Sequence, residues 1–282
     1  MHPHWYDRNV PATFDLAVSY YGDNPTAFSE STIRHVARGG KWDGLYAFFA
    51  DNPALLEAYD WVWLPDDDIA TTAASINRLF DVVEEHALDV AQPSLTWDSF
   101  YSHFVTLHNP NFRLRWTNWV EVMVPVLDAA LLRRALPTFA ECRYGWGLEF
   151  LWPRWMPEPA FRTAIVDSVA VRHVRPVGKG TLSRNSGKAP VEERQRLMSR
   201  YLREEPRITV YAGIDTRGRR LNRGLRLKAT LFAGWMPLRR QRQATGKFVI
   251  KTRSLFRAVR KMTRDRPKLT PLPFAPEEFR YR

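Results

Sequence analysis

The chain has 282 residues, of which 45% are hydrophobic and 13% aromatic, enough for a folded core, so a wholly disordered protein is excluded. Its single cysteine excludes an intrachain disulfide and a zinc site built from several thiolates. The net charge of +12 is uneven: residues 1–170 carry 12 Lys and Arg against 22 Asp and Glu, a net −10, while residues 171–282 carry 30 against 8, a net +22. This asymmetry predicts an acidic folded body and a basic region that binds anions.

The lengths of the apolar stretches indicate the cellular compartment. No stretch reaches the roughly 18 to 20 apolar residues of a membrane span, and the first residues lack the apolar core of a secretion signal. We therefore expect a cytoplasmic protein that at most touches the inner face of the membrane.

Predicted strands and helices alternate from Thr13 to about Val177. The strands are predicted at residues 13–22, 61–64, 89–95, the first part of 118–136, and 163–177. The helices are predicted at 24–52 with a Gly-Gly break, 71–88, the second part of 118–136, and 145–152. Such alternation predicts an α/β fold with a mainly parallel sheet flanked by helices, whose ligands bind beyond the C-terminal ends of the strands.

Three consecutive carboxylates, Asp66, Asp67 and Asp68, follow the aromatic strand predicted at 61–64. In an extended chain, residues i and i+2 point to the same side, so Asp66 and Asp68 could converge while Asp67 faces away. Carboxylate oxygens are natural ligands of Mg²⁺ and Mn²⁺, and a cation shared with a diphosphate would relieve the repulsion among these charges. A solvated acidic loop would give the same pattern, and the residues alone leave both interpretations open.

Five blocks connect the chain with a known family: YDWVWLPDDDI, VAQPSL, NWVEVMVPV, YGWGLEF and VDSVAVRHVRPVG. Their order and spacing resemble those of a plant and bacterial family of unknown function, labelled "lysine-ketoglutarate reductase trans-splicing related". That family resembles glycosyltransferases of the GT-A fold, which transfer a sugar from a nucleotide-sugar donor. The resemblance covers roughly residues 13 to 177. It implies a Rossmann-type, GT-A-like domain over residues 1–180, followed by a basic extension over 181–282.

The resemblance also implies a role for each matching acidic position on the donor side. The triplet is similar to an Asp-x-Asp motif, so Asp66 and Asp68 would hold Mn²⁺ or Mg²⁺, or the donor's ribose, with Asp67 assisting. His173 occupies the place of a late histidine that completes the metal shell in many such enzymes. Taken alone, a histidine between valines in a strand is better explained by packing, and the resemblance brings the two interpretations level.

On the acceptor side, the resemblance makes Glu149 in the GWGLE segment the candidate catalytic base. Sugar transfer with inversion needs a carboxylate that takes the proton of the acceptor hydroxyl. Glu121 would bind sugar hydroxyls at the pocket edge, and Trp146 with Gly147 would shape the donor and acceptor pocket. Exposure on a helix is the alternative for Glu149, and packing is the alternative for Trp146.

The N-terminal region departs from the family pattern. GT-A domains open with a strand and loop that hold the nucleotide base, and here Thr13–Gly22 corresponds to the second such strand. About a dozen residues precede it, too few for another strand and helix of ordinary length. We expect either that the first nucleotide-binding strand is missing or that the nucleotide site is built differently.

The basic third contains two arginine-rich features. Phe248–Met262 predicts a basic amphipathic helix, which would either lie on an anionic membrane surface or dock on the domain with a solvated basic face. The arginines between Arg217 and Arg226 could bind phosphates of nucleic acid or lipid.

Together the acidic motif and the resemblance imply a metal-dependent glycosyltransferase that uses a nucleotide-sugar donor and a polysaccharide or glycolipid acceptor. Two alternatives remain: an RNA-binding protein that uses the arginine-rich third, and a degenerate transferase fold used only for binding. Nucleic acid ranks behind the sugar substrates because no recognised nucleic-acid module accompanies the arginines.

Overall fold

The computed structural model describes residues 5–6, 9–24, 26–28, 31–37, 39–177, 188–202, 207–240 and 251–272. Residues 178–187 and the first three residues of the helix predicted at Phe248–Met262 lie outside them. The described helices are α1 (Lys41–Asp51), α2 (Leu55–Ala58), α3 (Ala73–Glu85), α4 (Ala129–Phe139), α5 (Leu148–Leu151), α6 (Ala189–Tyr201), α7 (Leu225–Trp235) and α8 (Thr252–Arg264). The described strands are β1 (Ala17–Tyr20), β2 (Ile33–Val36), β3 (Trp61–Trp63), β4 (Ile69–Ala70), β5 (Val90–Leu95), β6 (Phe112–Thr117), β7 (Val126–Asp128), β8 (Thr163–His173), β9 (Val210–Asp215) and β10 (Arg220–Asn222).

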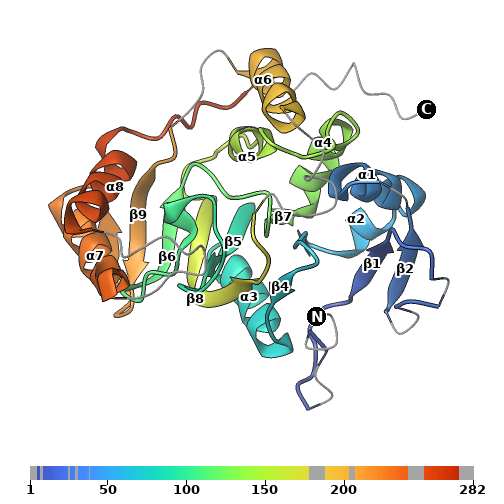
Figure 1. The fold of residues 1–282 in the computed structure, drawn as a ribbon, viewed down its shortest axis with the longest axis horizontal. Helices are drawn as coiled ribbons and strands as arrows, with labels where there is room; N and C mark the ends of the chain where they lie inside the picture. Colours follow the sequence, from blue (N-terminus) through green and yellow to red (C-terminus); the bar gives the residue numbers. More distant parts are fainter. Residues whose placement is uncertain are drawn as a thin grey trace.

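An eight-stranded mixed sheet forms the centre of the molecule (Figure 1). Its order is β10-β9-β6-β8-β5-β7-β3, with β4 paired to β8 off this path. Within the described residues, β5 and β8 are the one parallel pair of this sheet, and every other pairing is antiparallel. The α/β class is therefore confirmed, but the prediction of a mainly parallel sheet is wrong.

The reason lies in the connections between β5, β6 and β7. A parallel neighbour needs a long crossover, usually a helix, to bring the chain back to the same end of the sheet. Between β5 and β6 the chain has loops and one turn of 3₁₀ helix, Phe104–Thr106, so β6 runs opposite to β5. Strands β6 and β7 run in the same direction but are not neighbours, and each is antiparallel to the strands beside it. Strand β6 was not predicted from the sequence.

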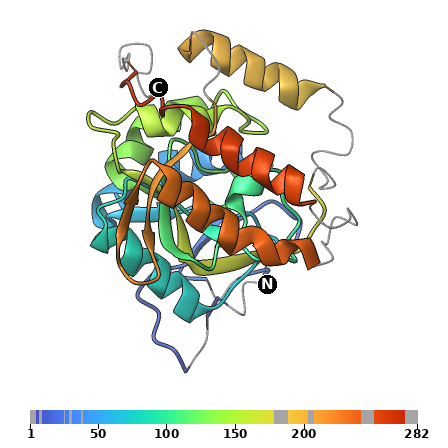
Figure 2. The same ribbon diagram turned by 90° about the vertical axis from the view of Figure 1, so that its left-hand side faces the viewer.

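The basic extension contributes two strands to the same sheet. β9 pairs with β6 and β10 pairs with β9, so residues beyond 180 complete the sheet rather than follow it. Helices α7 and α8 lie side by side along this end of the molecule (Figure 2), opposite the end that holds α1, α2, β1 and β2. None of the helices in the described ranges is long and apolar enough to span a membrane.

A buried ion pair joins the middle of the sheet. Arg115 on β6 and Asp167 on β8 are both fully buried, with Nε–Oδ2 and Nη2–Oδ1 distances of 2.5 and 2.9 Å. The guanidinium also donates to the carbonyl oxygens of Val105 and Leu107, and Asp167 accepts from the backbone N–H of Asn109. This network fixes the loop after β5 against β6 and β8.

Candidate functional site

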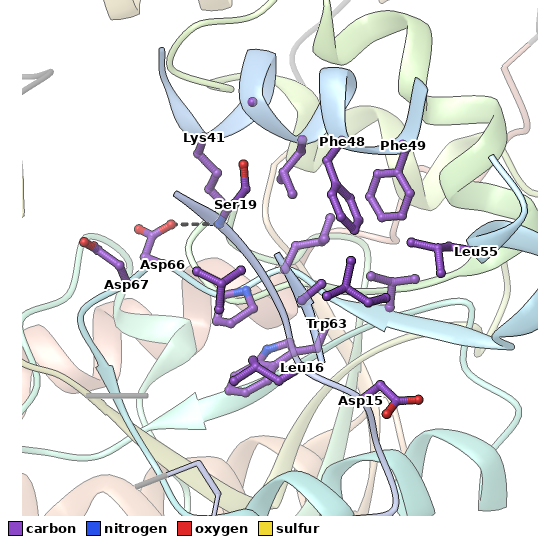
Figure 3. A pocket seen from close by; sticks show the side chains of 18 of the residues that line it. Asp15, Leu16, Ser19, Lys41, Phe48, Phe49, Leu55, Trp63, Asp66 and Asp67 are labelled. Atoms are coloured by element: carbon purple, nitrogen blue, oxygen red, sulfur yellow. Dashed lines mark hydrogen bonds and ion pairs between the residues drawn. The ribbon is translucent and has the colours of Figure 1, made fainter. Parts of the chain in front are cut away.

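The acidic triplet lies in the loop between β3 and β4. The backbone N–H of Asp66 donates to the carbonyl oxygen of Met123, 2.8 Å away, which fixes the triplet beside the loop that leads into β7. Lys41, the first residue of α1, places its Nζ 2.7 Å from Asp66 Oδ1 and 2.8 Å from the carbonyl oxygen of Val122 (Figure 3). The Asp66 carboxylate is therefore already paired with a cation of the chain.

Asp68 meets His173 because β4 pairs with the end of β8. Ile69 stands opposite His173 in that ladder, and His173 Nε2 lies 3.0 Å from Asp68 Oδ2. His173 Nδ1 lies 2.8 Å from the carbonyl oxygen of Phe100. A carbonyl and a carboxylate oxygen can only accept, so in this arrangement both ring nitrogens donate and the imidazole is charged.

The pKa shifts of His173 and Asp68 agree with an ion pair between them. Burial by itself would lower the pKa of His173, but the hydrogen bond and charge of Asp68 outweigh it and leave that pKa raised. For Asp68, burial would raise the pKa, yet the hydrogen bonds and charges of His173 and Arg175 lower it. Each group therefore favours the charged form of the other.

Arg175 binds two members of the triplet. Its Nε donates to Asp68 Oδ2 at 2.8 Å, and its Nη2 donates to Asp67 Oδ1. The other oxygen of Asp67 accepts from the Tyr21 hydroxyl at 3.1 Å. Asp66 and Asp68 thus hold separate partners, and Asp67 faces the outer side of the loop. The three carboxylates are matched by Lys41, His173 and Arg175.

Asp68 and His173 could supply some of the ligands of a divalent cation. Within the described residues no three His, Cys, Asp or Glu side chains gather around one point. Asp68 Oδ1, however, is buried and has no hydrogen-bond partner among them. His173 has its second nitrogen tied to a backbone carbonyl, which is how metal-binding histidines are usually oriented. After loss of the Nε2 proton of His173, one carboxylate and one neutral imidazole fit Mn²⁺ or Mg²⁺ when substrate phosphates and water supply the remaining ligands.

A second cluster of ionisable groups contains Glu121, His103 and Glu149. Glu121 is 4% exposed, and its Oε1 lies 3.5 Å from His103 Nδ1. Its Oε2 has no hydrogen-bond partner within the described residues. The pKa of His103 is raised, because the hydrogen bond and charge of Glu121 and the charge of Glu149 outweigh the opposing effect of burial.

Glu149 is the second residue of the short helix α5 and is 7% exposed. Burial raises its pKa to about 7, although the backbone N–H of Gly147 donates to its Oε2 at 2.8 Å and favours the charged form. Gly147 has a φ of 111°, a left-handed conformation that suits glycine, and this geometry turns its N–H toward the carboxylate. Trp146 is 42% exposed and does not pack in the core.

Two short loops connect the clusters. Val122 and Met123, whose carbonyls accept from Lys41, directly follow Glu121, and Phe100, which holds His173, precedes His103 by three residues. The candidate residues Asp66, Asp68, His173, Glu121 and Glu149 therefore lie along one continuous region.

Three charged residues of this region were not identified from the sequence. Lys41 follows the Gly-Gly break, and that position is its only signal. Arg175 had a clearer one, because it lies two residues after His173 and such residues share a side in an extended chain. His103 gave no signal.

A cavity of about 1480 Å³ adjoins the triplet, bounded by β1, α1 and β3. Figure 3 shows that Ser19, Lys41, Asp66 and Asp67 lie at one end of it, while Phe48, Phe49 and Leu55 lie at the other. Its volume exceeds the roughly 300 to 1,000 Å³ of ordinary ligand pockets, so it offers room for a nucleotide-sized molecule next to the triplet.

Comparison with known proteins identifies a family. A family model described as "Protein of unknown function (DUF707)" matches residues 14–209, well over half of the chain. No curated protein and no solved structure matches it. The matched range contains both clusters. It extends past residue 177, where the resemblance seen in the sequence ended, and beyond α6 to residue 209.

Proposed function

The chain belongs to the DUF707 family of proteins of unknown function, and we propose that it is a metal-dependent glycosyltransferase that uses a nucleotide-sugar donor. The observation that carries the proposal is the pairing of two clusters in one region. One joins Asp68 to His173 and Arg175, and the other holds Glu149 with a pKa of about 7. A diphosphate site beside a carboxylate base is what sugar transfer to a hydroxyl requires.

On the donor side, Asp68 and His173 would hold Mn²⁺ or Mg²⁺, with Asp66 in the same loop. The bound metal would neutralise charge on the donor's diphosphate. Lys41 and Arg175 are the chain's own cations at this position, and they would pair with phosphate oxygens once the carboxylates have another partner. The polar end of the cavity leaves space for the nucleoside.

On the acceptor side, Glu149 would take the proton of the acceptor hydroxyl. The hydroxyl oxygen forms a bond to the anomeric carbon of the sugar, the bond from that carbon to the nucleoside diphosphate breaks, and the diphosphate leaves. A base with a pKa near the working pH combines a large ionised fraction with a strong pull on the proton. Glu121 and His103 would bind hydroxyls of a polysaccharide or glycolipid acceptor, and the exposed ring of Trp146 offers a face on which a sugar can stack.

A thermal-shift screen tests the donor half of this proposal. UDP, GDP, CDP and dTDP are added singly, with and without Mn²⁺, and the melting temperature is measured. A ligand at 100 times its Kd stabilises the folded protein by about 2.7 kcal/mol, which corresponds to several degrees for a chain of this size. We expect one nucleotide to raise the melting temperature only when the metal is present.

Two variants test whether the shift in melting temperature depends on Asp68. Asp68→Asn keeps the shape of the side chain and should abolish the metal-dependent shift, whereas Asp98→Asn, an exposed aspartate outside both clusters, should retain it. A shift that needs no metal and persists in Asp68→Asn would remove the metal role. No shift with any nucleotide would favour the degenerate fold used only for binding.

A further inference from the structure

Four arginines form a stripe along the outer face of α8. Arg253, Arg257, Arg260 and Arg264 occupy positions i, i+4, i+7 and i+11, which lie on one side of an α-helix, and all four are exposed. The opposite side is buried, through Leu255, Val259, Met262 and Thr263. Of the two alternatives that the sequence left open, the described part of this helix takes the docked one, beside α7 (Figure 2).

The docking of α8 does not account for its charge. The helix contains no Asp or Glu, and Lys261 flanks the stripe. Arg264 is paired with Asp265, but the other three arginines have no ion pair with any residue of the described ranges. Like charges at i and i+4 destabilise a helix, and cations near a helix N-terminus, such as Arg253, oppose the helix dipole. An external anionic surface would relieve both effects.

Exposed apolar side chains accompany the stripe. Phe256, 59% exposed, lies next to the arginines, and its ring touches the edge of Phe232 on α7. Leu225, at the start of α7, is 83% exposed. Large apolar groups beside arginines on a helix that lies flat on a surface are typical of proteins bound at a membrane interface, where apolar groups enter the lipid and arginines meet the phosphates.

We propose that α8, with the exposed start of α7, binds the surface of an anionic lipid bilayer. Arg253, Arg257 and Arg260 contact lipid phosphates, and Phe256 inserts between the headgroups. The stripe is straight and carries one exposed aromatic ring, whereas a single-stranded nucleic acid would use a series of aromatic rings on which successive bases stack. This proposal does not depend on the transfer activity.

Vesicle sedimentation with the full chain tests the proposal. Vesicles of phosphatidylcholine alone are compared with vesicles containing 3 parts of phosphatidylglycerol in 10, at about 0.1 M salt. Each arginine near an anionic surface strengthens binding about fivefold, so the combined substitution Arg253→Gln, Arg257→Gln and Arg260→Gln should weaken binding to the anionic vesicles by about a hundredfold. Phe256→Ala should weaken it without a change of net charge.

A matched variant controls for net charge. Arg78→Gln, Arg113→Gln and Arg196→Gln remove the same charge from exposed positions on α3, β6 and α6, and binding should stay within about twofold of the parent chain. Circular dichroism melts confirm that each variant is folded. Equal losses in the two triple variants would overturn the proposal, because they would show a general charge effect. So would vesicle binding that ignores all substitutions in α8, or binding of single-stranded RNA through the three arginines without binding to vesicles.

Discussion

Replacing Asp167 with alanine is expected to lower the free energy of unfolding by about 3 to 5 kcal/mol, the largest effect on stability of any single change considered for this protein. The substitution leaves the guanidinium of Arg115, which is fully buried, without its carboxylate. Two carbonyl oxygens would remain as its partners, and they carry no full charge to offset that of the arginine. Urea unfolding followed by circular dichroism measures the loss.

The contribution of burial can be separated from that of charge. Arg162 and Asp89 form a second bidentate pair, but their side chains are 40% and 16% exposed, so Asp89→Ala should cost about 1 kcal/mol or less. The double substitution Arg115→Met and Asp167→Leu should recover most of the stability lost in Asp167→Ala, because no charge stays buried. Similar costs for Asp167→Ala and Asp89→Ala would contradict this account.

The Glu149→Gln substitution is expected to reduce transfer at least a hundredfold and to stabilise the protein at alkaline pH. General base catalysis contributes about 10² to 10⁴ in rate, and glutamine cannot accept the proton. Under the proposed function, transfer by the parent chain should accelerate as pH rises through about 7, where Glu149 loses its proton. Initial rates measured from pH 5.5 to 8.5, with the donor identified in the thermal-shift screen, test the hundredfold loss of transfer and its pH dependence.

The stability effect follows from the same pKa. Burial raises it from the ordinary 4.5 to about 7, so the folded state holds the proton more tightly than the unfolded state. The stability gained from that proton is fully present below pH 4.5 and is lost as pH rises to about 7. Above pH 7 the buried carboxylate costs up to about 3 kcal/mol, a penalty that glutamine avoids.

Thermal melts at two pH values measure this difference. Glu149→Gln should melt close to the parent chain at pH 4.5 and several degrees above it at pH 8. Glu121→Gln provides a comparison, since Glu121 belongs to the same cluster but is assigned no proton transfer and should retain part of the activity. Full transfer by Glu149→Gln would place the base elsewhere, and an equal melting temperature at pH 8 would contradict the raised pKa.

Part of the candidate site could be predicted from the sequence because its residues lie in short, recognisable blocks. The contact between Asp68 and His173 was implied by the family resemblance, and the ladder between β4 and β8 brings the two together. Lys41, Arg175 and His103 were missed, since a place after a Gly-Gly break or two residues beyond a motif is a weak signal, and His103 had none. Their roles arise because the tertiary structure brings together the loops that carry them.

The sequence by itself determined the α/β class, the place of the acidic triplet after an aromatic strand, and the excess of positive charge beyond residue 170. These features follow from periodicity and composition, which are local. The tertiary structure decided the direction of the strands, the entry of β9 and β10 into the central sheet, and the pairing of all three aspartates with cations of the chain. Each of these depends on contacts between residues far apart in the sequence, such as Asp68 with Arg175. Such contacts form when strands pair and side chains become buried, and no local pattern in the sequence reveals them.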